Sequence, residues 1–124
     1  MLCVRGDVKI RALDFIHKFK LTDAPNHAVE KCKLSLIDLI GVAAAGRSTK
    51  LSNIICEHVS EEFNGNLKLL FSSRTANPLG LALSAGMTID SIDAHDGFNP
   101  AKGHIGCPLF PAILAVARER QLTG

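Results

Sequence analysis

One fourteen-residue segment, residues 93–106 (DAHDGFNPAKGHIG), holds two carboxylates, two imidazoles, one ammonium group and three glycines. The segments before and after it, NPLGLALSAGMTIDSI and CPLFPAILAVARER, consist mainly of apolar and small helix-forming residues. Carboxylates and imidazoles are the side chains that most often carry protons in enzyme sites. The segment therefore predicts a loop between two helices with the parts of an acid–base site.

The two ends of this loop suggest different tasks. We expect the preceding helix to end near residue 92 or 93, where its negative dipole end favours the proton-carrying form of Asp93. The other end, KGHIG, leads into the next helix, whose free N–H groups attract anions. Lys102 and His104 add donors there, and Gly103 lets a ligand approach the backbone. Together these features favour proton transfer next to a bound carboxylate.

Simpler readings of the loop stay open. Asp96-Gly97 and Asn99-Pro100 are turn signals in their own right. His95 fits a solvated loop position, and a lysine such as the one in KGHIG is most often a surface residue. A metal site is a further alternative, but its four ligand candidates match no standard ligand spacing. Those four are Asp93, His95, Asp96 and His104.

Hydrophobic spacing and helix-capping residues predict a mostly α-helical chain with one short extended segment. Asp23 with Pro25, Thr49 or Ser48, and Asn77 with Pro78 are the expected helix starts. The expected helices cover residues 8–19, 24–45, 50–63, 78–92 and 108–120, and the extended segment is LKLLFSS at residues 67–73.

The second of these helices is apolar on nearly every side from Leu34 onward. A helix without a polar face is usually buried in a larger body, so we expect this chain to lack some of its packing partners. Asp38 interrupts that apolar stretch. If buried, its carboxylate needs a hydrogen bond or an ion pair, and a structural role is favoured over a catalytic one.

Composition is typical of one globular domain, with 124 residues, 47% hydrophobic residues, 21% charged residues and a net charge of +2. The interspersed charges form no basic stripe, which argues against nucleic-acid binding. No apolar run reaches membrane-spanning length, and Arg5 interrupts any signal-peptide core, so we expect a cytoplasmic protein. The four cysteines form no C-x-x-C pair and are expected to be small buried residues rather than disulfides or zinc ligands.

Three segments resemble the N-terminal region of MmgE/PrpD proteins. They are DLIGVAAAG at residues 38–46, NPLGLALSAGMTIDSIDAHDG at residues 77–97 and KGHIGCPLFPAILAVA at residues 102–117. The resemblance implies an all-α N-terminal domain of a larger, usually homodimeric protein. It also implies a lyase or isomerase that acts without a cofactor on small di- or tricarboxylates, such as a 2-methylcitrate dehydratase, a cis-aconitate decarboxylase or an iminodisuccinate epimerase.

By position, the resemblance gives Asp93 and His104 catalytic roles, and Asp96 falls on the next acidic position of the same turn. The dehydratase and decarboxylase branches carry a second Asp where this chain has His95, and a Thr where it has Gly97. The spacing to the final histidine is one residue longer here, so the substrate is not carried over. Family members are also much longer, so we expect residues 1–124 to be a single, incomplete helical domain that is inactive alone.

Two functions follow as hypotheses. The first is a portion of a lyase or isomerase, with Asp93 and His104 as catalytic residues and with substrate held by Lys102, His95, Asp96 and Gly103. The second is a non-catalytic helical module that buries its apolar faces against a partner chain.

Overall fold

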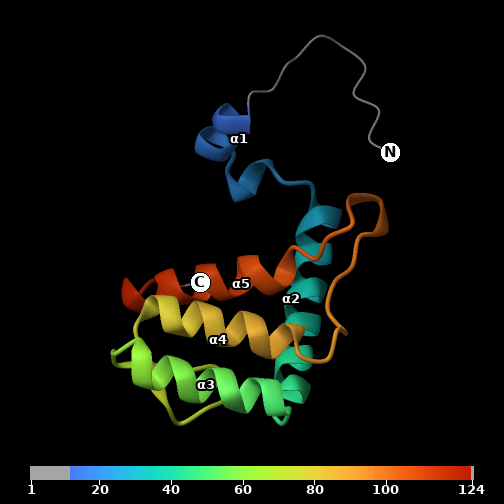
Figure 1. Ribbon diagram of the computed structural model, residues 1–124. Helices are drawn as coiled ribbons and strands as arrows, with labels where there is room; N and C mark the ends of the chain where they lie inside the picture. The colour runs from blue at the N-terminus through green and yellow to red at the C-terminus, as the bar shows by residue number, and fades with distance from the viewer. Residues whose placement is uncertain (1–11, 124) are drawn as a thin grey trace. The chain divides into compact units, whose positions relative to one another are not determined.

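The computed structural model describes residues 12–123 and confirms an all-α fold with a very short sheet. The described chain contains five α-helices, two 3-10 helices and two strands (Figure 1). In order they are α1 (Ala12–Lys18), η1 (Leu21–Asp23), α2 (Asn26–Gly46), α3 (Lys50–Glu62), β1 (Leu67–Lys68), β2 (Thr75–Ala76), α4 (Pro78–Asp90), η2 (Asn99–Ala101) and α5 (Gly106–Glu119). Residues 8–11 of the first predicted helix lie outside the described range.

The chain divides into two compact units, one that ends at Lys31 and one that begins at Cys32, so the boundary falls inside α2. In the first unit, the Asp23 carboxylate accepts a hydrogen bond from the Lys20 backbone N–H at 2.9 Å. That bond closes the η1 turn, and α2 begins only at Asn26. The prediction of Asp23 as the N-cap of the second helix is therefore wrong.

In the second unit, α3, α4 and α5 lie side by side with α4 in the middle, and neighbouring helices run in opposite directions (Figure 1). The part of α2 that belongs to this unit crosses them and packs against α4 and α5 through a small cluster. Its buried members are Leu39, Val42, Ala43 and Ile89, with Leu70, Cys107 and Phe110 partly buried against them. This crossing brings the end of α4 and the start of α5 close to α2.

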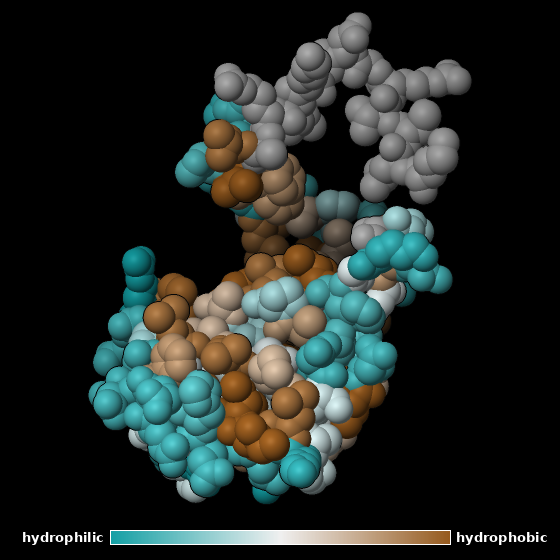
Figure 2. All heavy atoms as spheres, in the orientation of Figure 1, coloured by the Kyte–Doolittle hydropathy of each residue, from teal (hydrophilic) through white to brown (hydrophobic). Residues whose placement is uncertain are grey.

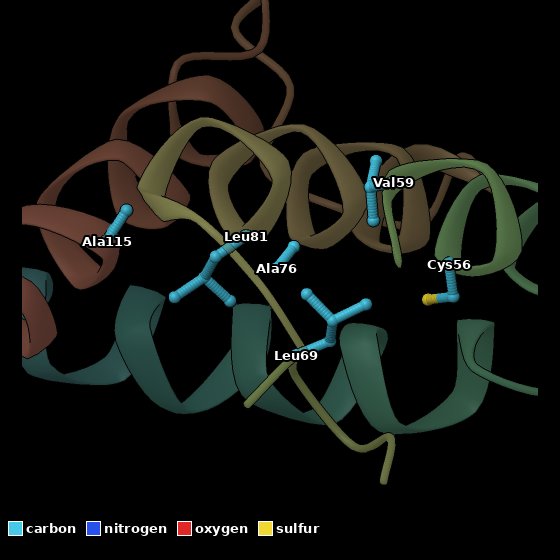
Figure 3. Packing of buried hydrophobic residues seen from close by; sticks show 6 residues of the cluster. All are labelled: Cys56, Val59, Leu69, Ala76, Leu81 and Ala115. Carbon is cyan, nitrogen blue, oxygen red and sulfur yellow. The ribbon is translucent and has the colours of Figure 1, made fainter. Parts of the chain in front are cut away.

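A second cluster forms the core between α3, α4, α5 and the hairpin (Figure 3). Small residues of α4 allow this packing, because a Cβ at Gly80 would fall within 2.9 Å of the Phe63 Cβ. The Ser52 and Thr88 hydroxyls form a buried hydrogen bond of 2.7 Å between α3 and α4. The six buried members of the cluster are Cys56, Val59, Leu69, Ala76, Leu81 and Ala115.

The helix starts predicted from capping residues are confirmed for α3 and α4. The Thr49 side chain accepts a hydrogen bond from the Ser52 N–H at 3.1 Å, and Asn77 Oδ1 accepts one from the Gly80 N–H at 3.0 Å. Pro78 occupies the first turn of α4, as predicted. These caps satisfy N–H groups that have no partner inside the helix.

Three predicted boundaries differ from the structure. The predicted fourth helix stops at Asp90 rather than near residue 92, and the fifth begins at Gly106 rather than residue 108. Of the predicted extended segment, residues 67–73, only Leu67–Lys68 is a strand. The chain turns immediately afterwards, because the Leu69 N–H bonds the Arg74 carbonyl at 3.0 Å and closes a hairpin.

Apolar side chains reach the surface of this helical body in several places, seen as brown areas in Figure 2. The most exposed on α2 are Leu34 and Ile37, at 59% and 67%. On α5, the side chains of Leu109, Ile113 and Val116 are each at least half exposed. Asp38 is also exposed, so its carboxylate does not need the hydrogen bond or ion pair that burial would require. Within residues 12–123, every helix is too short or too polar to cross a bilayer.

Candidate functional site

The loop between α4 and α5 contains every residue predicted for the site. It leaves α4 through a turn in which the Asp93 N–H donates to the Asp90 carbonyl at 3.0 Å. Asp93 has a φ of 48° and Lys102 a φ of 52°, both in the left-handed region. Asp tolerates this conformation better than most residues. The turn thus places the Asp93 side chain beyond the helix end, where it is exposed.

His95 lies inside the loop, not in solvent as one reading of the sequence suggested. Its side chain has 0% exposed surface, and its Nε2 lies 2.8 Å from Oδ1 of Asp90. The other ring nitrogen, Nδ1, is buried and has no hydrogen-bond partner among the described residues. Oδ1 of Asp96 lies 4.0 Å from Nδ1, too far for a hydrogen bond. A buried nitrogen without a partner is costly, so this position calls for an explanation.

The structure brings Asp93, His95 and His104 together. One carboxylate oxygen of Asp93 and one ring nitrogen of each histidine lie within 4.8 Å of one another. The two imidazole rings meet edge to face, with centroids 4.4 Å apart. His104 is exposed, whereas His95 is buried behind it. Asp93 and His104 therefore lie close enough to contact one small molecule.

Asp96 has a structural contact at the start of α5. Both of its carboxylate oxygens accept from the Gly106 N–H, each at 3.1 Å. From the sequence we expected the free N–H groups at the start of α5 to attract a substrate anion. The first of them, the Gly106 N–H, instead donates to the Asp96 carboxylate. This contact also explains why α5 begins two residues earlier than predicted. A substrate-binding role for Asp96 stays a prediction.

We expect Asp96→Ala to lower the free energy of unfolding by about 0.5–2 kcal/mol, because it removes a helix cap. Urea unfolding followed by circular dichroism measures this change. Asp38→Ala, which removes an exposed carboxylate from α2, is the matched control and should change stability by less than about 0.5 kcal/mol. Equal effects of the two substitutions would show that the bonds from Gly106 do not stabilise α5.

A pocket of about 430 Å³ opens beside His104. Lys102 and Gly103, both predicted to bind substrate, line it together with Gly97, Phe98 and Asn99. The loop folds back on itself around this pocket, because the Phe98 N–H donates to the Gly103 carbonyl at 3.1 Å. Asp93 and His95 are not among its lining residues. The pocket thus offers an ammonium and an imidazole to an anion.

Two residues that the sequence reading did not single out contribute to the site. Asp90 contacts the buried imidazole of His95. The sequence feature that could have indicated this role is a carboxylate at the last position of an apolar helix, α4. Cys107 lies near both. Burial, followed by the charges of Asp90 and Asp96, raises the pKa of the Cys107 thiol above its ordinary value. That thiol therefore stays protonated at neutral pH.

The structure is thus a helical domain. It presents an acidic, histidine-containing loop between two packed helices, α4 and α5. The chain belongs to the MmgE/PrpD family, because residues 11–124 match the model of the MmgE/PrpD N-terminal domain. Comparisons with curated proteins and with solved structures found no match. The family identified from the loop and helix motifs of the sequence is therefore confirmed.

Proposed function

We propose that this chain is part of a cofactor-independent lyase or isomerase that moves protons next to a carboxylate of a small di- or tricarboxylate. The observation that carries the proposal is the convergence of Asp93, His95 and His104 beside a pocket lined by Lys102. Family membership supports the same class of reaction. In this proposal the enzyme acts in the cytoplasm as a homodimer.

The roles follow from position and chemistry. One of Asp93 and His104 takes the proton from the carbon next to the carboxylate, and the other protonates the leaving group or the opposite face. Lys102 and the Gly103 backbone bind a substrate carboxylate, which stabilises the negative charge that develops on proton removal. His95, with Asp96 at its side, supports this arrangement from within the loop. No bound cofactor takes part in this scheme.

Further residues are needed to complete such a site. The pocket of about 430 Å³ is formed by a single loop, whereas sites for small molecules usually enclose most of the ligand surface. We propose that chain segments outside this helical domain close the pocket. The exposed apolar side chains of α2 and α5 are suitable surfaces for packing such segments.

The experiment is solvent-deuterium incorporation in the protein that carries this domain at its full natural length. A panel of di- and tricarboxylates, including cis-aconitate and 2-methylcitrate, is incubated in D2O and followed by NMR. We expect exchange or elimination at a carbon next to a carboxylate in at least one compound. The absence of exchange and elimination at such a carbon in every compound of the panel would contradict the proposal.

The exposed apolar faces also favour a second candidate, a non-catalytic module that packs against a partner chain. Sedimentation velocity and binding of a hydrophobic dye distinguish the two. A self-sufficient module would stay dispersed, bind little dye and unfold cooperatively. A catalytic domain that lacks its packing partners would bind dye and self-associate.

A further inference from the structure

A second use of the loop follows from the types and distances of its side chains. Asp93, His95 and His104 offer one oxygen and two nitrogens within 4.8 Å of one another. Some point therefore lies within about 2.8 Å of all three atoms, whereas zinc–ligand bonds are about 2.0–2.2 Å long. With the buried His95 atom fixed, movements of about 1 Å by the two exposed side chains, Asp93 and His104, would close this difference.

The buried ring of His95 is an independent observation that points to a ligand. Its Nε2 faces the Asp90 carboxylate at 2.8 Å, and because a carboxylate accepts, Nε2 is the nitrogen that donates and Nδ1 is the nitrogen left to act as a ligand. Nδ1 is the buried nitrogen without a partner among the described side chains. In metal sites, the second nitrogen of a ligating histidine almost always donates to a carboxylate, a backbone carbonyl or water. The Asp90–His95 pair thus has the arrangement of a metal ligand with its outer-shell partner.

We propose that Asp93, His95 and His104 bind a divalent transition-metal ion, with Nδ1 of His95 as the buried ligand and Asp90 as the residue that orients it. Two imidazoles and one carboxylate suit Zn²⁺ or Co²⁺ and leave a coordination position for water. Asp90, Asp93 and Asp96 place three carboxylates around the imidazole pair, and Lys102 is the one lysine or arginine among loop residues 91–105. A bound cation therefore offsets their repulsion.

A competing triad, Asp90, His95 and Cys107, shares the same imidazole. It is the weaker site for two reasons. Its carboxylate already accepts from Nε2 of His95, which occupies that nitrogen. The Cys107 Sγ lies 3.6 Å from the His104 carbonyl and donates to it, and burial raises the pKa of this thiol, whereas a metal needs the thiolate.

The metal site and the proton-transfer function are separate proposals. A bound ion would take the lone pairs that Asp93 and His104 need to move protons, so the metal-loaded protein is expected to be inactive. Metal binding requires only this chain, and its test needs no substrate. Either proposal can therefore fail while the other stands.

The test is a titration with Co²⁺, followed by its visible absorption, and competition by Zn²⁺ in calorimetry. We expect one ion per chain with a tetrahedral or five-coordinate cobalt spectrum. His104→Asn and Asp93→Asn, which change exposed side chains, should each weaken binding at least about 100-fold, and Asp90→Asn about 10–100-fold. His27→Asn, on the exposed first turn of α2, is the control and should bind like the wild type.

Three results would overturn the proposal. One is wild-type affinity in both His104→Asn and Asp93→Asn. Another is a thiolate-to-cobalt charge-transfer band that disappears in Cys107→Ser, which would assign the ion to the competing triad. The third is the absence of stoichiometric binding by the wild-type chain. If His95→Asn fails to fold, the variants of the two exposed ligands still decide the question.

Discussion

Gly46→Ala is expected to lower the free energy of unfolding by about 1–3 kcal/mol. A Cβ at this position would collide with the Thr88 carbonyl oxygen and lie 2.7 Å from the Ser91 hydroxyl. Ser91 stabilises this close contact between α2 and the end of α4, because its hydroxyl donates to the Gly46 and Thr88 carbonyls at 3.3 and 2.7 Å. Backbone atoms of α4 cannot move aside as a flexible side chain can, so α2 and α4 must separate.

Gly41 provides the matched control in the same helix. A Cβ there meets nothing within 4 Å, and the residue is exposed. Gly41→Ala should therefore stabilise the protein by about 0.5–1 kcal/mol, because alanine is the better helix former. Urea unfolding of both variants gives the comparison. If the two substitutions change stability in the same direction, the close crossing of α2 and α4 is refuted.

The largest effect on activity is expected at the two exposed site residues. In the full-length protein, His104→Asn and Asp93→Asn should each lower the rate of deuterium incorporation by about 10²–10⁴-fold, the usual contribution of a positioned acid or base. Both side chains are exposed, so melting should change little. Asn also tolerates the left-handed backbone of Asp93, whose φ is 48°.

The controls for this prediction are Asp38→Asn and His27→Asn, which remove the same functional groups from exposed positions on α2. Both should keep the wild-type rate. A rate loss in the site variants that only follows a loss of folded protein would make the loop structural. Wild-type rates in both site variants would remove Asp93 and His104 from the mechanism.

The sequence predicted the local features of the fold best. Thr49 and Asn77 cap α3 and α4 as expected, because capping depends on side chains within three residues. The start of α5 was misplaced, since it depends on Asp96, ten residues before Gly106. Such a contact leaves no local periodic signal. The end of α4 was misplaced for a different, local reason: Asp93 adopts a left-handed conformation, and its N–H closes a turn onto the Asp90 carbonyl.

The candidate site was predicted in composition but not in arrangement. One of the two interpretations of His95 placed it in solvent, whereas folding buries it against Asp90. Its burial depends on how the loop closes over the ends of two helices, and no short-range pattern encodes that closure. The edge-to-face contact of His95 with His104 is likewise a product of tertiary packing.

The central claim is that a small anionic metabolite binds between Asp93 and His104, and NMR titration of the imidazole signals tests it most directly. The full-length protein, selectively labelled at histidine, is titrated with a tricarboxylate such as cis-aconitate. The account predicts saturable shifts of the His104 and His95 signals that are lost in Lys102→Gln, with His27 and His58 unchanged. Equal small shifts of all the histidines, or shifts that survive Lys102→Gln, would contradict it.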